Sequence, residues 1–341
     1  MPLQILKVLS VVAIGFVYTI TTTGFAVLSL RKAQGAISKS SSSRSSTTAG
    51  SSAAKPFSDQ TMSLFLYGAI VLGLSSIIAT QTDFQLAIPI QTAFLGFATT
   101  AAYVWGARLP ASFTKVVHPL VTSCVILLTL VKVLGLATGR EFLDVLRTFK
   151  TGSLHPMKAG AGDVLLYLLG PSVVSFAISM YSRRQLLKSN LFVVAMAMLI
   201  SSVGGLFGTA GFVRAIGLGG PNGAMVRLSV LSRNVTTALA MAVTELLGGD
   251  ISIAASVVVL TGILGATYGK TFLTALGITD PVTRGLAIGA SSQGLGVASI
   301  SNEVDAFPFA AISMVLTAIC ATTLVSIPAV KETLIHLATG K

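Results

Sequence analysis

The chain has 341 residues, of which 53% are hydrophobic and only 10% are charged. A soluble domain carries about 25% charged residues, so this composition excludes a soluble globular protein and predicts an all-α polytopic membrane protein. The net charge of +12 comes from 23 Lys and Arg against 11 Asp and Glu. Many of these basic residues lie in short loops, as anionic lipid headgroups favour, although a basic vestibule would also attract an anionic substrate. No basic run interleaved with aromatic residues indicates a nucleic-acid partner.

Apolar runs of bilayer length predict about ten hydrophobic segments inside the lipid bilayer. In chain order they lie at 8–30, 63–80, 86–106, 117–137, 163–181, 190–210, 222–246, 251–276, 281–302 and 306–328. Residues 1–33 form an N-terminal hydrophobic segment, which we interpret as a membrane span rather than an uncleaved signal. Residues 34–62 are dense in Ser, Thr, Ala and Gly, which is typical of a flexible linker.

The residues that usually carry catalysis or bind metals are sparse. Cys124 and Cys320 fall inside predicted spans and make no CxxC pair, so they are expected to be small core residues. The three histidines are far apart, and the chain has no Walker loop and no GxSxG motif. We therefore expect no enzymatic activity, no metal site and no cofactor.

Two stretches in the C-terminal half share the same pattern of helix-ending Gly and Pro residues. GFVRAIGLGGP at 211–221 and TFLTALGITDP at 271–281 each consist of an apolar helix end, a Gly and a turn closed by Pro. The offset between Phe212 and Phe272 is 60 residues, and no gap is needed to keep it.

The same register aligns two polar hexapeptides, Ser232–Thr237 and Ser292–Val297, each of which interrupts an apolar segment. Paired interruptions at matching positions of two repeats point to a transport site in a membrane protein. We therefore predict two related repeats, at about 190–248 and 250–308, that carry interrupted helices. Whether the repeats are parallel or inverted remains open, because each interrupted segment could cross the bilayer or re-enter on one side.

The blocks AAYVWGARLPASFTKVVHPLV, from Ala101, and DPVTRGLAIGASSQGLGVA, from Asp280, carry a family likeness. With the blocks between them they resemble the LrgB/CidB membrane protein family, and in particular its plant and algal branch of plastidal glycolate/glycerate translocators. The resemblance covers about 101–341. It implies a secondary active transporter of glycolate and glycerate in the chloroplast inner envelope, serving photorespiration. Bacterial relatives, described as holin-like pores or regulators, provide the alternative.

The resemblance also implies a domain organisation. It assigns an LrgB-like transport region to 138–341 and scaffold-type helices, with a homodimer contact, to 63–137. Before residue 101 there is room for at most a partial LrgA-like half. One departure concerns the second interruption, where family members usually have His and Thr at the positions of Gln293 and Val297. Gln keeps hydrogen-bonding capacity but has no titratable group.

The interrupted segments hold the residue types that a small hydroxy acid needs. The guanidinium of Arg233 can pair a carboxylate bidentately, and backbone N–H groups at a helix break can add to the anion site. Small hydroxyl and amide side chains would bind the substrate hydroxyl, and glycines let the backbone approach the ligand. The candidate substrate-binding residues are Arg233, Asn234, Thr236, Thr237, Ser291, Ser292, Gln293, Gly294 and Gly296.

Structural alternatives stand beside these roles. Arg233 could snorkel to the interface from a helix start, or it could pair with Glu245 or Asp250. The hydroxyl side chains could serve close helix packing, which membrane helices favour in any case. Arg284, at a helix start, is expected to be an interfacial or structural charge.

Candidates for proton coupling are few. Glu245 and His118 are the possible coupling residues, and the alternative for Glu245 is an exposed acid at the membrane boundary. Glu303 and Asp305 fall in a predicted loop, where we expect them to be solvated.

Overall fold

A computed structural model describes residues 2–35, 57–114, 116–168, 170, 171, 174, 178, 181, 182, 184–220 and 223–340. Most of the Ser-rich stretch at 34–62 and part of the predicted span at 163–181 lie outside the described residues. Within the described ranges all regular structure is helical and no strand occurs, which confirms the all-α prediction.

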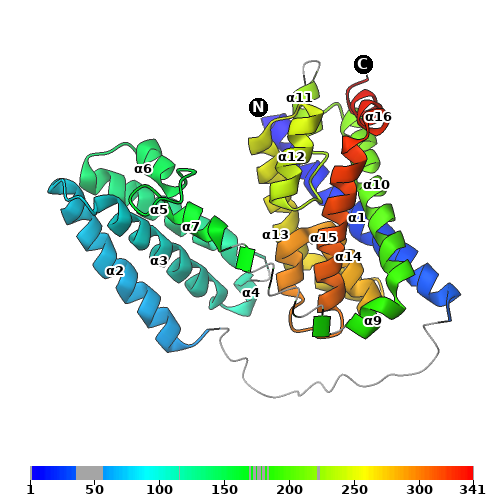
Figure 1. The fold of residues 1–341 in the computed structure, drawn as a ribbon, viewed down its shortest axis with the longest axis horizontal. Coiled ribbons are helices and arrows are strands. Elements are labelled where there is room, and N and C mark those ends of the chain that lie inside the picture. The colour runs from blue at the N-terminus through cyan, green and yellow to red at the C-terminus, as the bar shows by residue number, and fades with distance from the viewer. Residues whose placement is uncertain are drawn as a thin grey trace. The chain divides into compact units, whose positions relative to one another are not determined.

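The helices belong to two compact units (Figure 1). One unit contains α2 (Asp59–Gln81), α3 (Ala87–Ala107), α4 (Ala111–Thr114), α5 (Pro119–Thr138), α6 (Phe142–Phe149) and α7 (Ala161–Tyr167). The other contains α1 (Pro2–Ala33), α9 (Arg184–Ser189), α10 (Leu191–Ala215), α11 (Ala224–Ser229), α12 (Thr237–Leu247), α13 (Ile251–Ala275), α14 (Pro281–Ser299), α15 (Phe307–Ser326) and α16 (Pro328–Thr339). Helices α6 and α7 therefore pack with α2–α5. The division predicted from the sequence, at residue 137, instead assigns these two helices to the LrgB-like transport region, 138–341.

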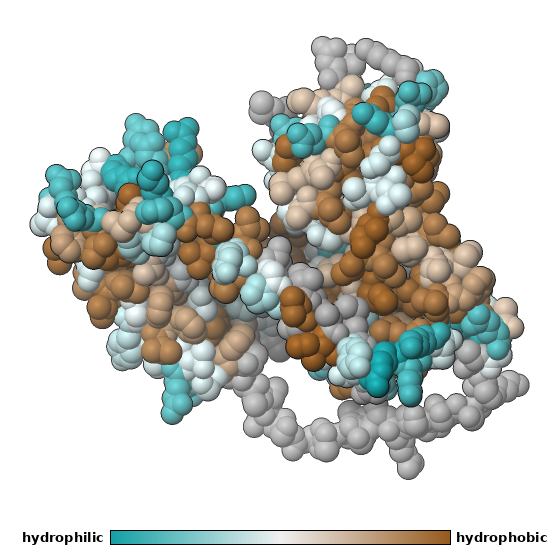
Figure 2. Space-filling model, in the orientation of Figure 1, coloured by the Kyte–Doolittle hydropathy of each residue, from teal (hydrophilic) through white to brown (hydrophobic). Residues whose placement is uncertain are grey.

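Seven of the described helices, α1, α2, α3, α5, α10, α13 and α15, are long and apolar enough to cross a membrane. Three of the ten predicted segments are not among the seven: 222–246 is divided into the short helices α11 and α12, 281–302 corresponds to α14, and part of 163–181 lies outside the described residues. In Figure 2 each unit shows hydrophobic surface between more hydrophilic ends. That distribution is what a lipid bilayer imposes on a membrane-spanning bundle.

Helices α10 and α13 match in length and in the way they end. Each has 25 residues, and Gly217 and Gly277, which follow them, have φ angles of 58° and 71°. Behind each glycine a backbone N–H turns back onto the helix, from Leu218 to the carbonyl of Val213 (3.1 Å) and from Ile278 to that of Leu273 (2.9 Å). The left-handed glycine closes both helices because a residue with a Cβ is strained in that conformation.

The N-terminal helix α1 packs inside the unit that contains α9–α16, against α10, α13 and α14. Figure 1 shows it in blue among the C-terminal helices. Near its start, Lys7 Nζ donates to the carbonyl of Gly217 (3.0 Å), and Gln4 Oε1 accepts from the Gly219 N–H (2.8 Å). These contacts fix the start of α1 to the turn that follows α10.

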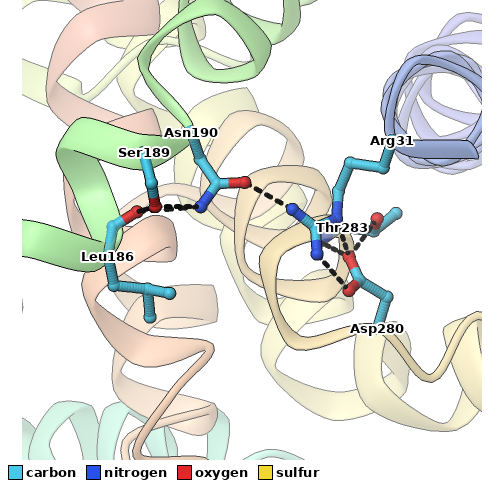
Figure 3. Close-up of polar contacts among 6 residues, drawn as sticks. All are labelled: Arg31, Leu186, Ser189, Asn190, Asp280 and Thr283. Atoms are coloured by element: carbon cyan, nitrogen blue, oxygen red, sulfur yellow. Dashed lines mark hydrogen bonds and ion pairs between the residues drawn. The ribbon is translucent and has the colours of Figure 1, made fainter. Parts of the chain in front are cut away.

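A second clamp fixes the other end of α1 (Figure 3). Arg31 forms an ion pair with Asp280, with Nε 2.9 Å from Oδ2 and Nη2 3.0 Å from Oδ1, and it also donates to the Asn190 side chain. Asp280 is the N-cap of α14, where its carboxylate accepts from the N–H (2.9 Å) and hydroxyl (2.7 Å) of Thr283. Asn190 in turn donates to the carbonyl of Leu186 (2.8 Å). The clamp ties α1 to α14 and to the start of α10.

Candidate functional site

The first broken segment lies between α11 and α12, where the chain is non-helical over residues 230–236. The residues from Val230 to Val235 are at most 1% exposed. Non-helical backbone at membrane depth is tolerated where it is buried in protein or lines a cavity. The break thus places the backbone and side chain of Arg233 in the interior of the unit.

Arg233 has no exposed surface, and no carboxylate in the described part of the chain forms an ion pair with it. Its Nε donates to Thr209 Oγ1 of α10 (3.1 Å) and its Nη2 donates to Thr19 Oγ1 of α1 (2.7 Å). Its Nη1 has no hydrogen-bond partner among the described residues. The alternative pairing with Glu245 or Asp250 is wrong, because Glu245 is exposed near the end of α12 and Asp250 accepts from the Ile253 N–H (2.9 Å) as the cap of α13.

The other two buried arginines of the described chain provide an internal comparison. Arg31 and Arg284 are each 9% exposed, whereas Arg233 is 0% exposed. Arg31 is paired with Asp280, and Arg284 binds Glu303 through two contacts of 2.8 Å. The expectation that Glu303 is solvated is therefore wrong, and Arg284 has the structural role predicted for it. The most deeply buried of the three guanidinium groups is the one that lacks an anion.

A cavity of about 240 Å³ adjoins the Arg233 guanidinium. It is lined by Val11, Ile14, Gly15 and Tyr18 of α1, by Gly208, Thr209 and Phe212 of α10, and by Arg233. Gly15 is required for the approach of α1, because a Cβ there would lie 2.3 Å from Arg233 Nε. The cavity has room for a small anion of a few heavy atoms, since one water molecule occupies about 30 Å³ in the liquid.

The second interruption is a single residue. Helix α14 is helical except at Gln293, which has φ 55° and ψ −151°. Such angles are strained for a residue with a Cβ and cost about 1–3 kcal/mol. The Gln293 side chain is 4% exposed, and neither Oε1 nor Nε2 has a partner among the described residues. Gln293 occupies the position equivalent to Arg233 in the 60-residue register.

The first break is linked to α15 through α10, whereas the second break packs on α15 directly. Asn234 Nδ2 donates to the Ser201 carbonyl (3.3 Å), and the Ser201 hydroxyl lies 3.0 Å from that of Thr317 on α15. One helical turn earlier on α15, Met314 Sδ lies 3.8 Å from the position of a Cβ on Gly294. The two positions on α15, Thr317 and Met314, are about one helical turn apart, and the first break is connected to its position through Ser201 of α10.

Unpaired buried polar atoms are concentrated in these breaks. Eight buried side-chain nitrogen and oxygen atoms lack a hydrogen bond in the described part of the chain. Four of them are Arg233 Nη1, Asn234 Oδ1 and both amide atoms of Gln293. Buried polar groups normally form hydrogen bonds, so unpaired polar atoms concentrated in the two breaks indicate that a polar ligand or water binds there.

The remaining predicted site residues differ in their surroundings. Ser291 donates to the carbonyl of Ala287 (2.8 Å) and lies 2.9 Å from the Ser292 hydroxyl, so both serines already have partners. Thr236 and Thr237 are half-buried at the start of α12. Gly296 is buried, and a Cβ there would lie 2.3 Å from Ser292 Cβ, which makes it a packing glycine.

His118 lies in the other compact unit as the N-cap of α5, where its Nδ1 accepts from the Leu120 N–H (3.3 Å). Burial lowers the pKa of its imidazole and favours the neutral ring. Within its own unit the exposed Glu245 forms no hydrogen bond with Arg233 or Gln293 among the described residues. Their coupling roles remain predictions.

Comparison with known proteins decides the family. The LrgB-like family profile matches residues 99–330. The chain belongs to the LrgB-like family. It is 31% identical over 332 residues to the plastidal glycolate/glycerate translocator 1, chloroplastic, of Arabidopsis thaliana, an alignment that covers 96% of this chain and 62% of the relative. The chain thus spans less than two thirds of that relative's length. No solved structure matches the chain.

Helix α1 lies outside the residues matched by the LrgB-like profile, yet it supplies Gly15 and Tyr18 to the lining of the Arg233 cavity and Thr19 as a hydrogen-bond acceptor for the guanidinium. Sequence reasoning missed these residues and their neighbour Thr209 on α10. A signal was present, because Gly15 and Thr19 on α1, like Gly205 and Thr209 on α10, are spaced four residues apart. Small and hydroxyl residues at that spacing mark close helix contacts in membranes.

The strain at Gln293 predicts an unusual order of stabilities. Gln293→Gly and Gln293→Ala both remove the unpaired amide, but only Gly adopts a positive φ without strain. Glycine loses more conformational entropy on folding than alanine does, which offsets part of this advantage. We therefore expect the free energy of unfolding of Gln293→Gly to be about 1 kcal/mol higher than that of Gln293→Ala. Thermal unfolding in detergent micelles measures the difference. An alanine variant as stable as the glycine variant would show that residue 293 is helical in the protein.

Proposed function

We propose that this protein is a secondary active transporter of small hydroxycarboxylates, with glycolate and glycerate as its substrates. The observation that carries the proposal is the fully buried Arg233, which has no carboxylate partner and adjoins a 240 Å³ cavity. The Arabidopsis relative supports this substrate class through its name. The word chloroplastic in that name supports a plastid location, and we propose the chloroplast inner envelope for this protein.

The chemistry of the cavity suits a hydroxy acid. The substrate carboxylate would pair with the guanidinium of Arg233 through Nη1, the nitrogen without a protein partner. The hydroxyl groups of Tyr18, Thr19 and Thr209 border the same space or the same guanidinium and would bind the substrate hydroxyl. A site that binds a hydroxyl discriminates against keto acids, because its own polar groups are left unpaired when the hydroxyl is missing.

The unpaired charge also favours exchange over net transport. A charged side chain in the middle of a bilayer costs about 2.5–3.5 kcal/mol on insertion scales. Binding of a monovalent anion neutralises the site, so conformational change is easier with substrate bound than without it. Alternating access would move the two broken segments and their shared support α15 relative to the rest of the protein.

Counterflow in proteoliposomes tests the proposal. Vesicles preloaded with glycerate should accumulate labelled glycolate with saturable kinetics. Empty vesicles should accumulate it at least about 10-fold more slowly, because the unloaded protein must change conformation with the Arg233 charge unpaired, and an energetic cost of only about 1.4 kcal/mol for that step corresponds to a factor of ten. Release of unrelated solutes such as sucrose at the same rate as glycolate would contradict a carrier. It would favour the holin-like pore.

A further inference from the structure

The unit that contains α2–α7 has a polar hollow of about 400 Å³ at one end. Its walls come from the end of α2, the turn that follows it, the first turns of α3, Arg140 after α5 and the segment at 148–158. Arg140 and Lys158 contribute two positive charges, and Asp83 contributes one negative charge. The charged groups of the lining therefore leave a formal net charge of +1, from two cations and one anion.

Arg140 is held by an internal chain of hydrogen bonds. Its Nη1 donates to Gln91 Oε1 (3.2 Å), and Gln91 Nε2 donates to Thr148 Oγ1 (2.7 Å). Gln91 is 6% exposed, so the acceptor that orients the guanidinium is itself fixed by packing. No described carboxylate forms an ion pair with Arg140. A preoriented guanidinium without a protein anion is suited to binding phosphate.

The segment that carries Lys158 is ordered by a buried acid. The Asp163 carboxylate accepts from the backbone N–H groups of Thr151 (2.8 Å), Gly152 (2.9 Å) and Gly160 (2.9 Å). The Thr151 hydroxyl lies 2.9 Å from the Lys158 carbonyl. The loop is thereby closed on itself, and among the described residues Asp163 forms no ion pair with Lys158.

An apolar groove of about 550 Å³ continues from the polar hollow along α3 and α7. Thr92 lines both spaces, and Lys158 of the hollow is followed by Ala159 of the groove. Along α3 the groove extends from Pro89 to Thr100, a rise of about 16 Å. That length is about half of the ~30 Å hydrocarbon core, so it matches the depth of one lipid leaflet.

We propose that this hollow and groove bind one phospholipid of net charge −1, with its phosphate at Arg140 and Lys158 and an acyl chain between α3 and α7. The net charge of the pocket favours a singly charged headgroup. Asp83 can only accept hydrogen bonds when ionised, so a headgroup with hydroxyl donors, as in phosphatidylglycerol, satisfies it, whereas a choline headgroup does not. Basic pockets between membrane helices bind anionic lipid headgroups by this chemistry.

Native mass spectrometry of the purified full chain tests the headgroup contact. Phosphatidylglycerol should bind at least about 10-fold more tightly than phosphatidylcholine, which corresponds to 1.4 kcal/mol. The double variant Arg140→Gln/Lys158→Gln should lose this preference. Its matched control is Arg147→Gln/Lys150→Gln, which removes two charges that lie nearby on exposed residues outside the hollow. Equal binding of the two lipids, or equal loss in both double variants, would overturn the proposal.

A third variant separates a lipid from a free anion. Gly96 lies in the groove, and a Cβ added there meets no atom within 4 Å. Gly96→Leu should fill the acyl-chain space and weaken phosphatidylglycerol binding at least about 10-fold, while inorganic phosphate, measured by isothermal titration calorimetry, should bind the variant and the wild type alike. Unchanged lipid binding in Gly96→Leu would show that no acyl chain occupies the groove and would overturn that part of the proposal, whereas phosphate binding without any preference for phosphatidylglycerol would show that the hollow binds a free anion only.

Discussion

Arg233→Met is expected to abolish saturable glycolate uptake without lowering the stability of the protein. The transport effect follows from the loss of a charge-assisted pair with the substrate, which is worth about 3 kcal/mol, or a factor of about 100 in affinity. The stability effect has the opposite sign from that of most buried arginines. No acid is left unpaired when Arg233 is removed, and an apolar side chain of similar volume avoids the cost of burying a charge.

Arg284→Met is the matched control for this prediction. It also removes a buried guanidinium from the same unit, but it leaves Glu303 without its partner. We expect it to lower the free energy of unfolding by about 1–3 kcal/mol, toward the low end because Glu303 is 31% exposed in its side chain. Counterflow in proteoliposomes and thermal unfolding in detergent, measured on both variants, give the comparison.

Two outcomes would contradict the role of Arg233. If Arg233→Met unfolds at a lower temperature than the wild type, the guanidinium has a structural anion in the protein. If it transports glycolate at the wild-type rate, the anion site lies elsewhere. Arg233→Lys refines the test, because lysine keeps the charge but cannot form the planar bidentate pair. It should retain part of the uptake that Arg233→Met loses.

Local signals in the sequence were sufficient to predict the helical breaks. Gly217 and Gly277 end two helices of equal length because only glycine adopts the left-handed conformation freely. A glycine after an apolar helical run therefore predicts a helix end from the sequence alone. The polar hexapeptide around Arg233 interrupts an apolar run, and the helix is broken there over 230–236. At Gln293 the same argument predicts a break, but the structure confines it to one residue of α14.

Contacts between distant segments could not be predicted in this way. Nothing local indicates that Arg284 pairs with Glu303, because the pairing depends on how the loop before α15 folds back onto the start of α14. The contribution of α1 is a stronger case. Thr19 and Arg233 are separated by 214 residues, and a stretch of linker-like composition follows α1. Such composition indicates where a chain is flexible but not where the preceding helix packs.

The contact between α1 and Arg233 leads to the second large effect, which is expected from Gly15→Ala. A Cβ at residue 15 would lie 2.3 Å from Nε, 2.4 Å from Cζ and 2.9 Å from Nη2 of Arg233. The guanidinium must therefore move by about 1 Å, and the adjoining cavity is the space available to it. A misplacement of about 1 Å at a binding constellation can cost a factor of about 100, so we expect glycolate counterflow to fall by 10- to 100-fold.

Stability should respond differently from transport. Alanine is favoured over glycine within a helix by about 1 kcal/mol, which offsets part of the cost of moving Arg233. Gly15→Ala is therefore expected to remain folded and to show a thermal unfolding temperature within a few degrees of the wild type. The measurement pairs this temperature with the rate of glycolate uptake in proteoliposomes.

Gly24→Ala on the same helix is the matched control. Its Cβ would lie 3.1 Å from Ile278 Cδ1, an apolar methyl that can shift, and far along α1 from the Arg233 cavity. If α1 only anchors the protein in the membrane, the two variants should transport alike. A large loss confined to Gly15→Ala would instead place α1 in the wall of the binding site, because both substitutions add the same methyl group to the same helix and only one of them adds it against the unpaired guanidinium.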